Sequence, residues 1–533
     1  MRSTFMGLEA SKRGLFTQQS ALYTTGHNIS NANTEGYSRQ RVNMQPTLGY
    51  PGIGLNAPKT AGFIGTGVQA SAVERIRDSF VDKQFRQETN KLGYWEARSK
   101  SITQMEDILN EPSDYGLSKA MDEFWNSLQD LNVNPEDGGA RAVVVQRGIA
   151  VADSFNYMYN SIKQLRDNAG EEIGILLEDA NSILEQIASI NEQIMAVEPN
   201  GYMPNDLYDA RDNLIDQLSS YFPVETKKVE SGGNALDQAE GSLTVFLNLN
   251  GKQVKLVDGN QFAQLRNSGP SDPDGVTPTD KITGLHIVKV NADKSETHLN
   301  EDWTQTGTQT DYDINLFNNL GKFKGLVDSY GYETTGVTKG LYPEMLEKLN
   351  TMAKEFANEF NKIHRDDPNN DEGRTSDLYG NPGEDFFVSK DNSGNITAGN
   401  IYVSDSLIKD PNKIAASNSV GAEPGNGKNA LNLANVKFAT IAALDDVSVQ
   451  TYFEGLIGQL GVDGQQAYRL TYNAQTLQQA VLERRASVSS VSLDEEMTNM
   501  ITFQQAYNAS ARMITVIDET LDKIINGMGR VGL

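Results

Sequence analysis

The amino-acid sequence predicts an elongated, multidomain α+β protein with coiled-coil-like helices at both ends, a helical bundle, and a β-rich domain inserted into that bundle. Apolar residues recur at helical spacing through most of the chain, alternate at strand spacing only within about 224–335, and then return to helical spacing. The 533 residues, 38% hydrophobic and 22% charged, have the composition of soluble globular domains and the length of roughly three or four of them. This nesting differs from the βαβ alternation of many enzymes.

The clearest helical pattern lies near the C-terminal end. Between Leu493 and Met528, positions at alternating steps of four and three are apolar or aromatic except at Gln504 and Asp518, as a coiled-coil seam requires. A weaker pattern opens the chain, with apolar residues spaced by seven. These residues are Leu8, Leu15, Leu22 and Ile29. Neither helix buries its stripe alone, and two arrangements stay open: packing into the core of a helical domain, or pairing with each other and with copies in neighbouring molecules.

Further elements are predicted between these ends. Apolar seams indicate helices over 80–110, 117–131, 140–168, 173–197, 207–218, 345–363 and 456–481. The pair Asn250-Gly251 between two alternating runs predicts a β-hairpin, and residues 284–290 predict another strand.

These elements predict three domains. They are a terminal helical core of residues 1–48 and 490–533, a helical middle domain of 49–223, 336–365 and 430–489 with a loop-rich part at 366–429, and an inserted β-rich outer domain of 224–335. Both termini are then expected at one end of the molecule.

Charge and cysteine content exclude several functions. The net charge is −25, so the chain lacks the clustered positive charge that general nucleic-acid or anionic-membrane binding requires. Cysteine is absent, which excludes disulfides, thiolate nucleophiles and cysteine-based metal sites. We find neither a secretory signal peptide nor an apolar run long enough to span a membrane. Ordinary rules would then predict a cytoplasmic protein, unless an export machinery that needs no such signal is used.

No catalytic, cofactor or metal site is expected. None of the histidines has metal-ligand spacing; His27 is expected at a helix end, and His286 and His298 are expected to face solvent. The segment 366–373 has alternating acidic residues, but its glycine is misplaced for an EF-hand, so an acidic turn is predicted. The glycine-rich segment 49–67 has no lysine at P-loop spacing.

One polar stretch carries a more specific signal. NISNANTEGYSRQ, residues 28–40, resembles the Asn-Ile-x-Asn-Ala-Asn-Thr-x-Gly-Tyr motif shared by the bacterial flagellar axial proteins of the rod, hook and junction. The ending Ser-Arg-Gln is similar to the family of flagellar hook-associated protein 1, the first hook–filament junction proteins. ERIRDSFVDKQFRQE (74–88), DLYDARDNLIDQLS (206–219) and the closing segment 491–525 also resemble that family. The segment 224–335 has no recognisable motif.

The resemblance implies a structural, non-enzymatic protein of the extracellular flagellum, exported without a cleaved signal peptide by the flagellar type III apparatus. It implies a ring-like homo-oligomer at the junction of hook and filament. The implied partners are copies of itself, hook protein, a second junction protein and an export chaperone at the C-terminal region. We expect the terminal stripes and the polar turn to make the subunit contacts. The predicted assembly residues are Leu8, Leu15, Leu22, Ile29, Asn31, Asn33, Gly36, Tyr37, Arg39, Met497, Met500, Tyr507, Ile514, Leu521 and Ile525.

The turn has a physical explanation as well. Asn and Gly tolerate the left-handed backbone, so Asn31 to Gly36 are expected to end the first helix and turn the chain outward. Tyr37 and Arg39 are then expected to hold the turn against the next subunit, with a purely local turn as the alternative.

Rival functions remain open at this point. The β-rich insert makes a flagellar surface adhesin the main alternative, and an enzyme hidden in the insert would need clustered ionisable residues there. Flagellin is the nearest rival of the same class, but flagellin starts lack the run from Asn31 to Tyr37.

Overall fold

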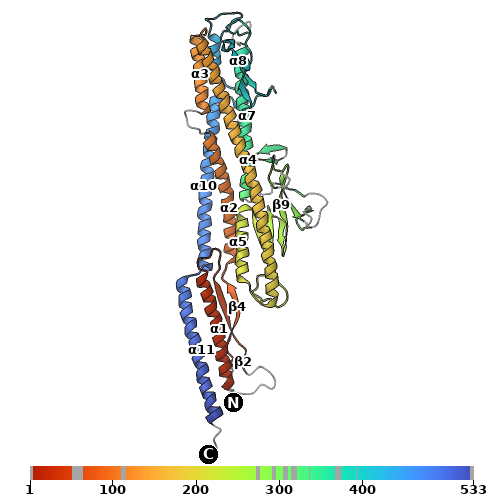
Figure 1. Ribbon diagram of the computed structural model, residues 1–533, viewed down its shortest axis with the longest axis vertical. Coiled ribbons are helices and arrows are strands. Elements are labelled where there is room, and N and C mark those ends of the chain that lie inside the picture. Colours follow the sequence, from red (N-terminus) through yellow and green to blue (C-terminus); the bar gives the residue numbers. More distant parts are fainter. Residues whose placement is uncertain are drawn as a thin grey trace, which may run out of the picture.

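The computed structural model describes residues 4–50, 64–109, 116–271, 276–290, 296–303, 310–313, 321–334, 336–366, 374–391 and 393–527. It is a long, mainly helical molecule with small antiparallel sheets, and both chain ends lie at the same end of it (Figure 1). The predicted elongated α+β fold is confirmed. The predicted acidic turn lies outside the described residues except at Asp366, as does most of the glycine-rich segment, 51–63.

The helices run along the length of the molecule. They are α1 (Thr4–Ser30), α2 (Ser79–Leu109), α3 (Leu117–Val133), α4 (Gly138–Val197), α5 (Asn205–Tyr221), α6 (Lys322–Tyr330), α7 (Leu341–Arg365), α8 (Asp405–Lys409), α9 (Lys428–Asn435), α10 (Val449–Ser489) and α11 (Leu493–Gly527). In the described part of the chain no helix is both long enough and apolar enough to cross a membrane.

The strands are short. They are β1 (Gln40–Pro46), β2 (Gly49–Tyr50), β3 (Ile64–Gly65), β4 (Val68–Arg75), β5 (Val224–Val229), β6 (Ser242–Leu249), β7 (Lys252–Asp258), β8 (Gln261–Phe262), β9 (Gln264–Ser268), β10 (Gly284–Val290), β11 (Glu296–Leu299), β12 (Tyr312–Asp313), β13 (Tyr332–Thr334), β14 (Val337–Lys339), β15 (Phe387–Ser389) and β16 (Ile401–Val403). An antiparallel ribbon of β1 and β4 lies beside α1, and β5 to β8 form one of the larger sheets.

The helix α4 corrects one expectation. Two helices were predicted, over 140–168 and 173–197, but residues 138–197 form one helix of 60 residues, which is about 90 Å long at 1.5 Å per residue. Its glycines are contact points: a Cβ at Gly170 would lie 2.9 Å from the ring of Tyr330, and one at Gly174 only 2.1 Å from Thr277. The glycines therefore let other segments approach the helix closely, at a small cost in helix propensity.

The β-rich segment packs on α4. The side chain of Asn191 binds both the N–H and the C=O of Leu243, at 3.1 and 2.9 Å, and Asn181 does the same at Leu265, at 2.7 and 3.1 Å. The predicted hairpin is confirmed, with Asn250 and Gly251 at positive φ between β6 and β7.

Two histidines are placed differently from the expectation. His286 was predicted to face solvent, but it is 7% exposed. Its ring centroid lies 5.6 Å from that of the half-buried His298. Residues on both faces of β10 are buried, so this strand does not alternate between buried and solvent-facing side chains. His286 is therefore buried like its neighbours.

His364 is a core residue. It is fully buried, its Nδ1 lies 2.5 Å from the carbonyl of Glu384, and its Nε2 accepts the N–H of Ala415 at 3.0 Å. Burial lowers the pKa of His364 to about 4, so the ring is neutral at pH 7 and joins the loop-rich part to α7.

Candidate assembly interface

The helices α1 and α11 lie side by side at the end of the molecule that carries both termini (Figure 1). A Cβ placed on Gly7 would lie 3.4 Å from Ile517, and one placed on Gly14 would lie 3.3 Å from Ser510. Moving seven residues forward along α1 therefore moves seven residues backward along α11. The two terminal helices form an antiparallel pair within one chain.

The face of α1 that contacts α11 includes a row of small residues. Gly7 and Gly14 meet α11 directly, and the buried Ala21 and Asn28 continue the same spacing of seven. Small side chains let two helices approach closely. This row lies one position before the predicted apolar stripe. The stripe residues are half-buried: Leu8, Leu15, Leu22 and Ile29.

On α11 a half-buried row contains Ser510 and Ile517 and so faces α1. Four predicted residues belong to this row: Met500, Tyr507, Ile514 and Leu521. Two others do not, because Met497 is 56% and Ile525 is 68% exposed. The structure thus divides the predicted C-terminal stripe into residues used within the chain and residues still open.

Large apolar side chains remain exposed after α1 and α11 have paired. On α11, Leu493, Met497 and Ile501 follow one another at steps of four, which places them on one face. The exposed set on both helices is Phe5, Phe16, Tyr23, Leu493, Met497, Ile501, Met513, Val516, Ile524 and Ile525. Several exposed apolar side chains on neighbouring helix faces are typical of an interaction site.

Asn28, the first residue of the polar motif, holds the two ends of the turn together. The Asn28 side chain donates to the carbonyl of Gln40 at 2.8 Å and accepts the N–H of Gln40 at 3.0 Å. It also accepts the Tyr37 hydroxyl at 2.8 Å and donates to Glu496 at 3.1 Å. Asn28 is 1% exposed, so one buried amide joins the end of α1, the start of β1 and the start of α11.

The predicted turn residues follow. The backbone and side-chain N–H groups of Asn31 both donate to the carbonyl of His27, at 3.1 Å each, and Asn33 is exposed. Gly36 has a φ of +76°, and a Cβ there would lie 2.0 Å from the side chain of Asn213. Gly36 is therefore required both by its backbone conformation and by the close approach of α5.

Tyr37 and Arg39 have partners in their own chain. The ring of Tyr37 lies against His27, and burial, with the carboxylates of Asp206 and Asp209, raises the pKa of Tyr37 above its ordinary value. The hydroxyl therefore stays protonated and donates to Asn28. Through these contacts Tyr37 stabilises the turn within its own chain. A contact of Tyr37 with a neighbouring subunit is a proposal.

Arg39 joins the turn to the joint between α10 and α11. Its guanidinium binds Glu495 through both Nη atoms, at 3.0 and 2.8 Å, and Glu496 through Nε at 2.7 Å. Its backbone N–H donates to the carbonyl of Ser489, the last residue of α10, at 2.8 Å. The hydrogen bond to Glu495 is the main reason that the pKa of Arg39 is raised. The acidic first turn of α11 also suits the positive end of the helix dipole.

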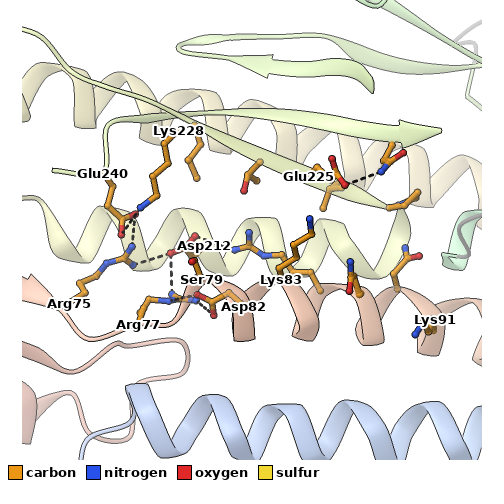
Figure 2. A pocket seen from close by; sticks show the side chains of 18 residues that line it. Arg75, Arg77, Ser79, Asp82, Lys83, Lys91, Asp212, Glu225, Lys228 and Glu240 are labelled. Atoms are coloured by element: carbon orange, nitrogen blue, oxygen red, sulfur yellow. Dashed lines mark hydrogen bonds and ion pairs between the residues drawn. The ribbon is translucent and has the colours of Figure 1, made fainter. Parts of the chain in front are cut away.

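A network of arginines and carboxylates fixes this region to the body of the molecule, and Figure 2 shows the part of it around Arg75, Arg77 and Asp212. Its members come from β4, from the connection between β4 and α2, from α2, α5 and α10, and from the loop before β6. They are Arg75, Arg77, Arg86, Arg211, Arg485, Asp82, Asp209, Asp212, Asp216 and Glu240. The five positive and five negative charges balance, as buried charges require.

Two residues show how the network is connected. Arg75, with a side chain only 3% exposed, binds Asp209 at 2.7 Å, Asp212 at 3.0 Å and Glu240 at 2.8 Å. Burial by itself would raise the pKa of Asp212, but the guanidinium groups around it, Arg77 foremost, hold that pKa well below its ordinary value. Asp209 also accepts the backbone N–H and hydroxyl of Ser38, at 3.0 and 2.7 Å. The network therefore reaches the polar turn directly.

Sequence reasoning missed Asn28, Ser38, Gln40, Glu495, Glu496 and the whole charged network as candidates. A signal was present in two of the segments that resemble the axial proteins. Residues 74–88 contain Arg75 and Arg77, and residues 206–219 place Asp209, Asp212 and Asp216 on one face of α5. In the described residues no group of histidine and carboxylate side chains has the arrangement to hold a metal ion.

Comparison with protein families first gives the class. A model described as flagella basal body rod protein matches residues 8–37, and one described as the C-terminal part of the flagellar basal body rod FlgEFG proteins matches residues 484–527. The two matches cover most of α1, the polar stretch as far as Tyr37, and all of α11. The terminal pair is thus similar to that of the rod-type proteins of the bacterial flagellum.

The remaining comparisons give the family. The model of the flagellar hook-associated protein FlgK helical domain matches residues 102–387. Flagellar hook-associated protein 1 of Bacillus subtilis (strain 168) is 42% identical over 533 residues, covering 99% of each chain. That of Salmonella typhimurium is 30% identical over 230 residues, which are 43% of this chain and 40% of the relative. The chain belongs to the family of flagellar hook-associated protein 1.

A solved structure shares the fold. The flagellar hook junction protein FlgK from Burkholderia pseudomallei superposes with a TM-score of 0.57 at 14% identity, covering 76% of this chain and 100% of that chain.

Proposed function

We propose that the protein is a structural, non-enzymatic component that joins the flagellar hook to the filament, and that copies of it assemble side by side through their terminal helix pairs. The observation that carries the proposal is the exposed apolar surface left on α1 and α11 after they have paired within the chain. Membership in the family of flagellar hook-associated protein 1 supports the location.

The proposed assembly gives each part of the molecule a role. The terminal pairs form the inner wall of a ring and continue the arrangement of hook protein, and the helical body seats the second junction protein. The predicted residues Leu8, Leu15, Leu22, Ile29, Met500, Tyr507, Ile514 and Leu521 build the pair itself. Met497 and Ile525, exposed on the single chain, contact neighbouring copies.

Export is proposed to follow the flagellar route without a cleaved signal peptide. The exposed apolar side chains of α11 are the surface that an export chaperone would cover before secretion, because an amphipathic helix binds in a groove by its apolar face. Location on the extracellular part of the flagellum follows from the same proposal.

The test is deletion of the gene, followed by electron microscopy of the cells and an assay of flagellin in the medium. Hooks without filaments, together with flagellin monomers in the medium, are the expected result. Normal filaments would rule out a required junction role, and normal filaments with loss of attachment would favour the adhesin function of the β-rich segment.

A further inference from the structure

A cavity of about 800 Å³ lies between β5 and the helices α2 and α5 (Figure 2). Its floor includes Arg75, Arg77 and Asp212 of the charged network, and Lys83 and Lys228 stand at its sides. The proposed junction role involves the charged network, but it assigns no function to the cavity or to Lys83 and Lys228.

Outside the balanced charged network, the charged side chains that line the cavity are three lysines, Lys83, Lys91 and Lys228, and one acid, Glu225. Six lysines and arginines line it, against four aspartates and glutamates, whereas the chain as a whole carries −25. Lys83 is exposed and has no ion-pair partner among the residues that the structure describes. Lys228, 59% exposed, lies 3.6 Å from Glu240, a distance typical of a weak surface pair. The two ammonium groups are available to a negatively charged ligand.

The strand β5 offers backbone groups at the same place. In the described part of the chain, β5 pairs only with β6, in an unbroken antiparallel register. The carbonyl of Pro223 accepts the N–H of Asn248, so odd-numbered residues of this strand direct their backbone groups to β6. The even-numbered residues Val224, Thr226 and Lys228 direct theirs to the free edge, and all three line the cavity.

We propose that this cavity binds an extended acidic peptide segment of another protein molecule, which adds to the free edge of β5 as a further strand. The backbone of the segment would pair with Val224, Thr226 and Lys228, and its carboxylates would lie against Lys83 and Lys228. Strand addition supplies affinity through main-chain hydrogen bonds, and the lysines select for negative charge. A small anion would use the charges alone and leave the strand edge unpaired. The inference does not depend on the junction role.

The first experiment measures binding of a fluorescent peptide of alternating threonine and glutamate to the full chain by anisotropy. The glutamate peptide is expected to bind, and a threonine–lysine peptide of the same length is not. The double variant Lys83→Glu/Lys228→Glu should weaken binding by about tenfold or more, because like charges then face each other. The variant Lys119→Glu/Lys354→Glu, with the same change of charge at exposed positions outside the cavity, should bind as the unchanged protein does. Absence of binding of the glutamate peptide would overturn the proposal.

The second experiment tests the strand geometry. Thr226→Pro removes an N–H from the free edge without removing a hydrogen bond to β6, so it should abolish peptide binding. Hydrogen exchange on the unchanged protein provides a readout that does not depend on folding of a variant. The amides of Thr226 and Lys228 should become protected when the peptide is added. Binding that leaves these amides unprotected would overturn strand addition and indicate a purely electrostatic contact.

Discussion

At the scale of single residues, the polar turn is stabilised by buried groups rather than by groups exposed on its surface. Asn28 binds both backbone groups of Gln40, and Gly36 lies where no side chain fits. The motif NISNANTEGYSRQ is thus explained in part by the packing of one chain. Asn33 is exposed, and the contacts within the described chain do not explain its presence in the motif.

Replacing Gly36 by alanine should destabilise the protein by about 1–3 kcal/mol, because a non-glycine residue is strained at positive φ and the new methyl group meets Asn213. Calorimetric unfolding measures the effect. Gly26→Ala is the matched control: it lies inside α1, has open space around it, and should stabilise the chain by about 0.5–1 kcal/mol. Equal effects of the two substitutions would contradict this assignment.

The two carboxylates that bind Arg39 should differ in importance. The Glu496 side chain is 3% exposed and that of Glu495 is 56% exposed. Glu496→Gln should cost about 1.5–3 kcal/mol, because it weakens a buried charge-assisted contact, whereas Glu495→Gln should cost at most about 1 kcal/mol. Unfolding of the two variants under identical conditions decides the matter, and a larger loss for Glu495→Gln would refute the order.

At the scale of elements, the charged network makes the joint sensitive to acid. The pKa of Asp212 is lower in the folded chain than in the unfolded chain, so its contribution is complete above the unfolded pKa of about 3.9 and is lost as the pH falls further toward the folded value. Asp212→Asn should lower stability at pH 7 by about 3 kcal/mol, and the difference from the unchanged protein should shrink below about pH 4. Melting temperatures across pH measure this. The exposed Asp237→Asn is the control, and a difference that is constant in pH would contradict the mechanism.

The sequence predicted the helices well because their apolar periodicity is long and regular, as in α7 and α11. It divided α4 in two, and the glycines in that region, Gly170 and Gly174, lie where the distant Tyr330 and Thr277 approach the helix, which no local pattern reveals. The contact row of α1 was missed because Gly7 and Gly14 have no hydrophobic signal; only their spacing could have revealed it. The network joins residues as far apart in sequence as Arg75 and Arg485, and no local pattern encodes such contacts.

At the scale of the whole molecule, the terminal helix pair carries ten exposed large apolar side chains on α1 and α11. The double substitution Met497→Glu/Ile501→Glu should leave the single chain folded, because both side chains are already 56% and 55% exposed. It should prevent assembly at the hook, since two charges would enter an apolar contact. Complementation of a deletion strain, scored by filaments, is the measurement. Ile175→Glu, at an exposed site on α4, is the control. Normal filaments with the double substitution would place the subunit contacts elsewhere.

The joint between the terminal pair and the body has a mechanical consequence. Only three residues, 490–492, connect α10 to α11, so covalent linkage by itself would allow the pair to swivel. Arg75, at the end of β4, and Ser38, after the polar turn, both bind Asp209 of α5, so rotation of the pair against the body must break these contacts together. A rotating appendage loads its connections in torsion. In such an appendage, torque applied to the terminal helices would reach the body through these side-chain contacts as well as through the backbone.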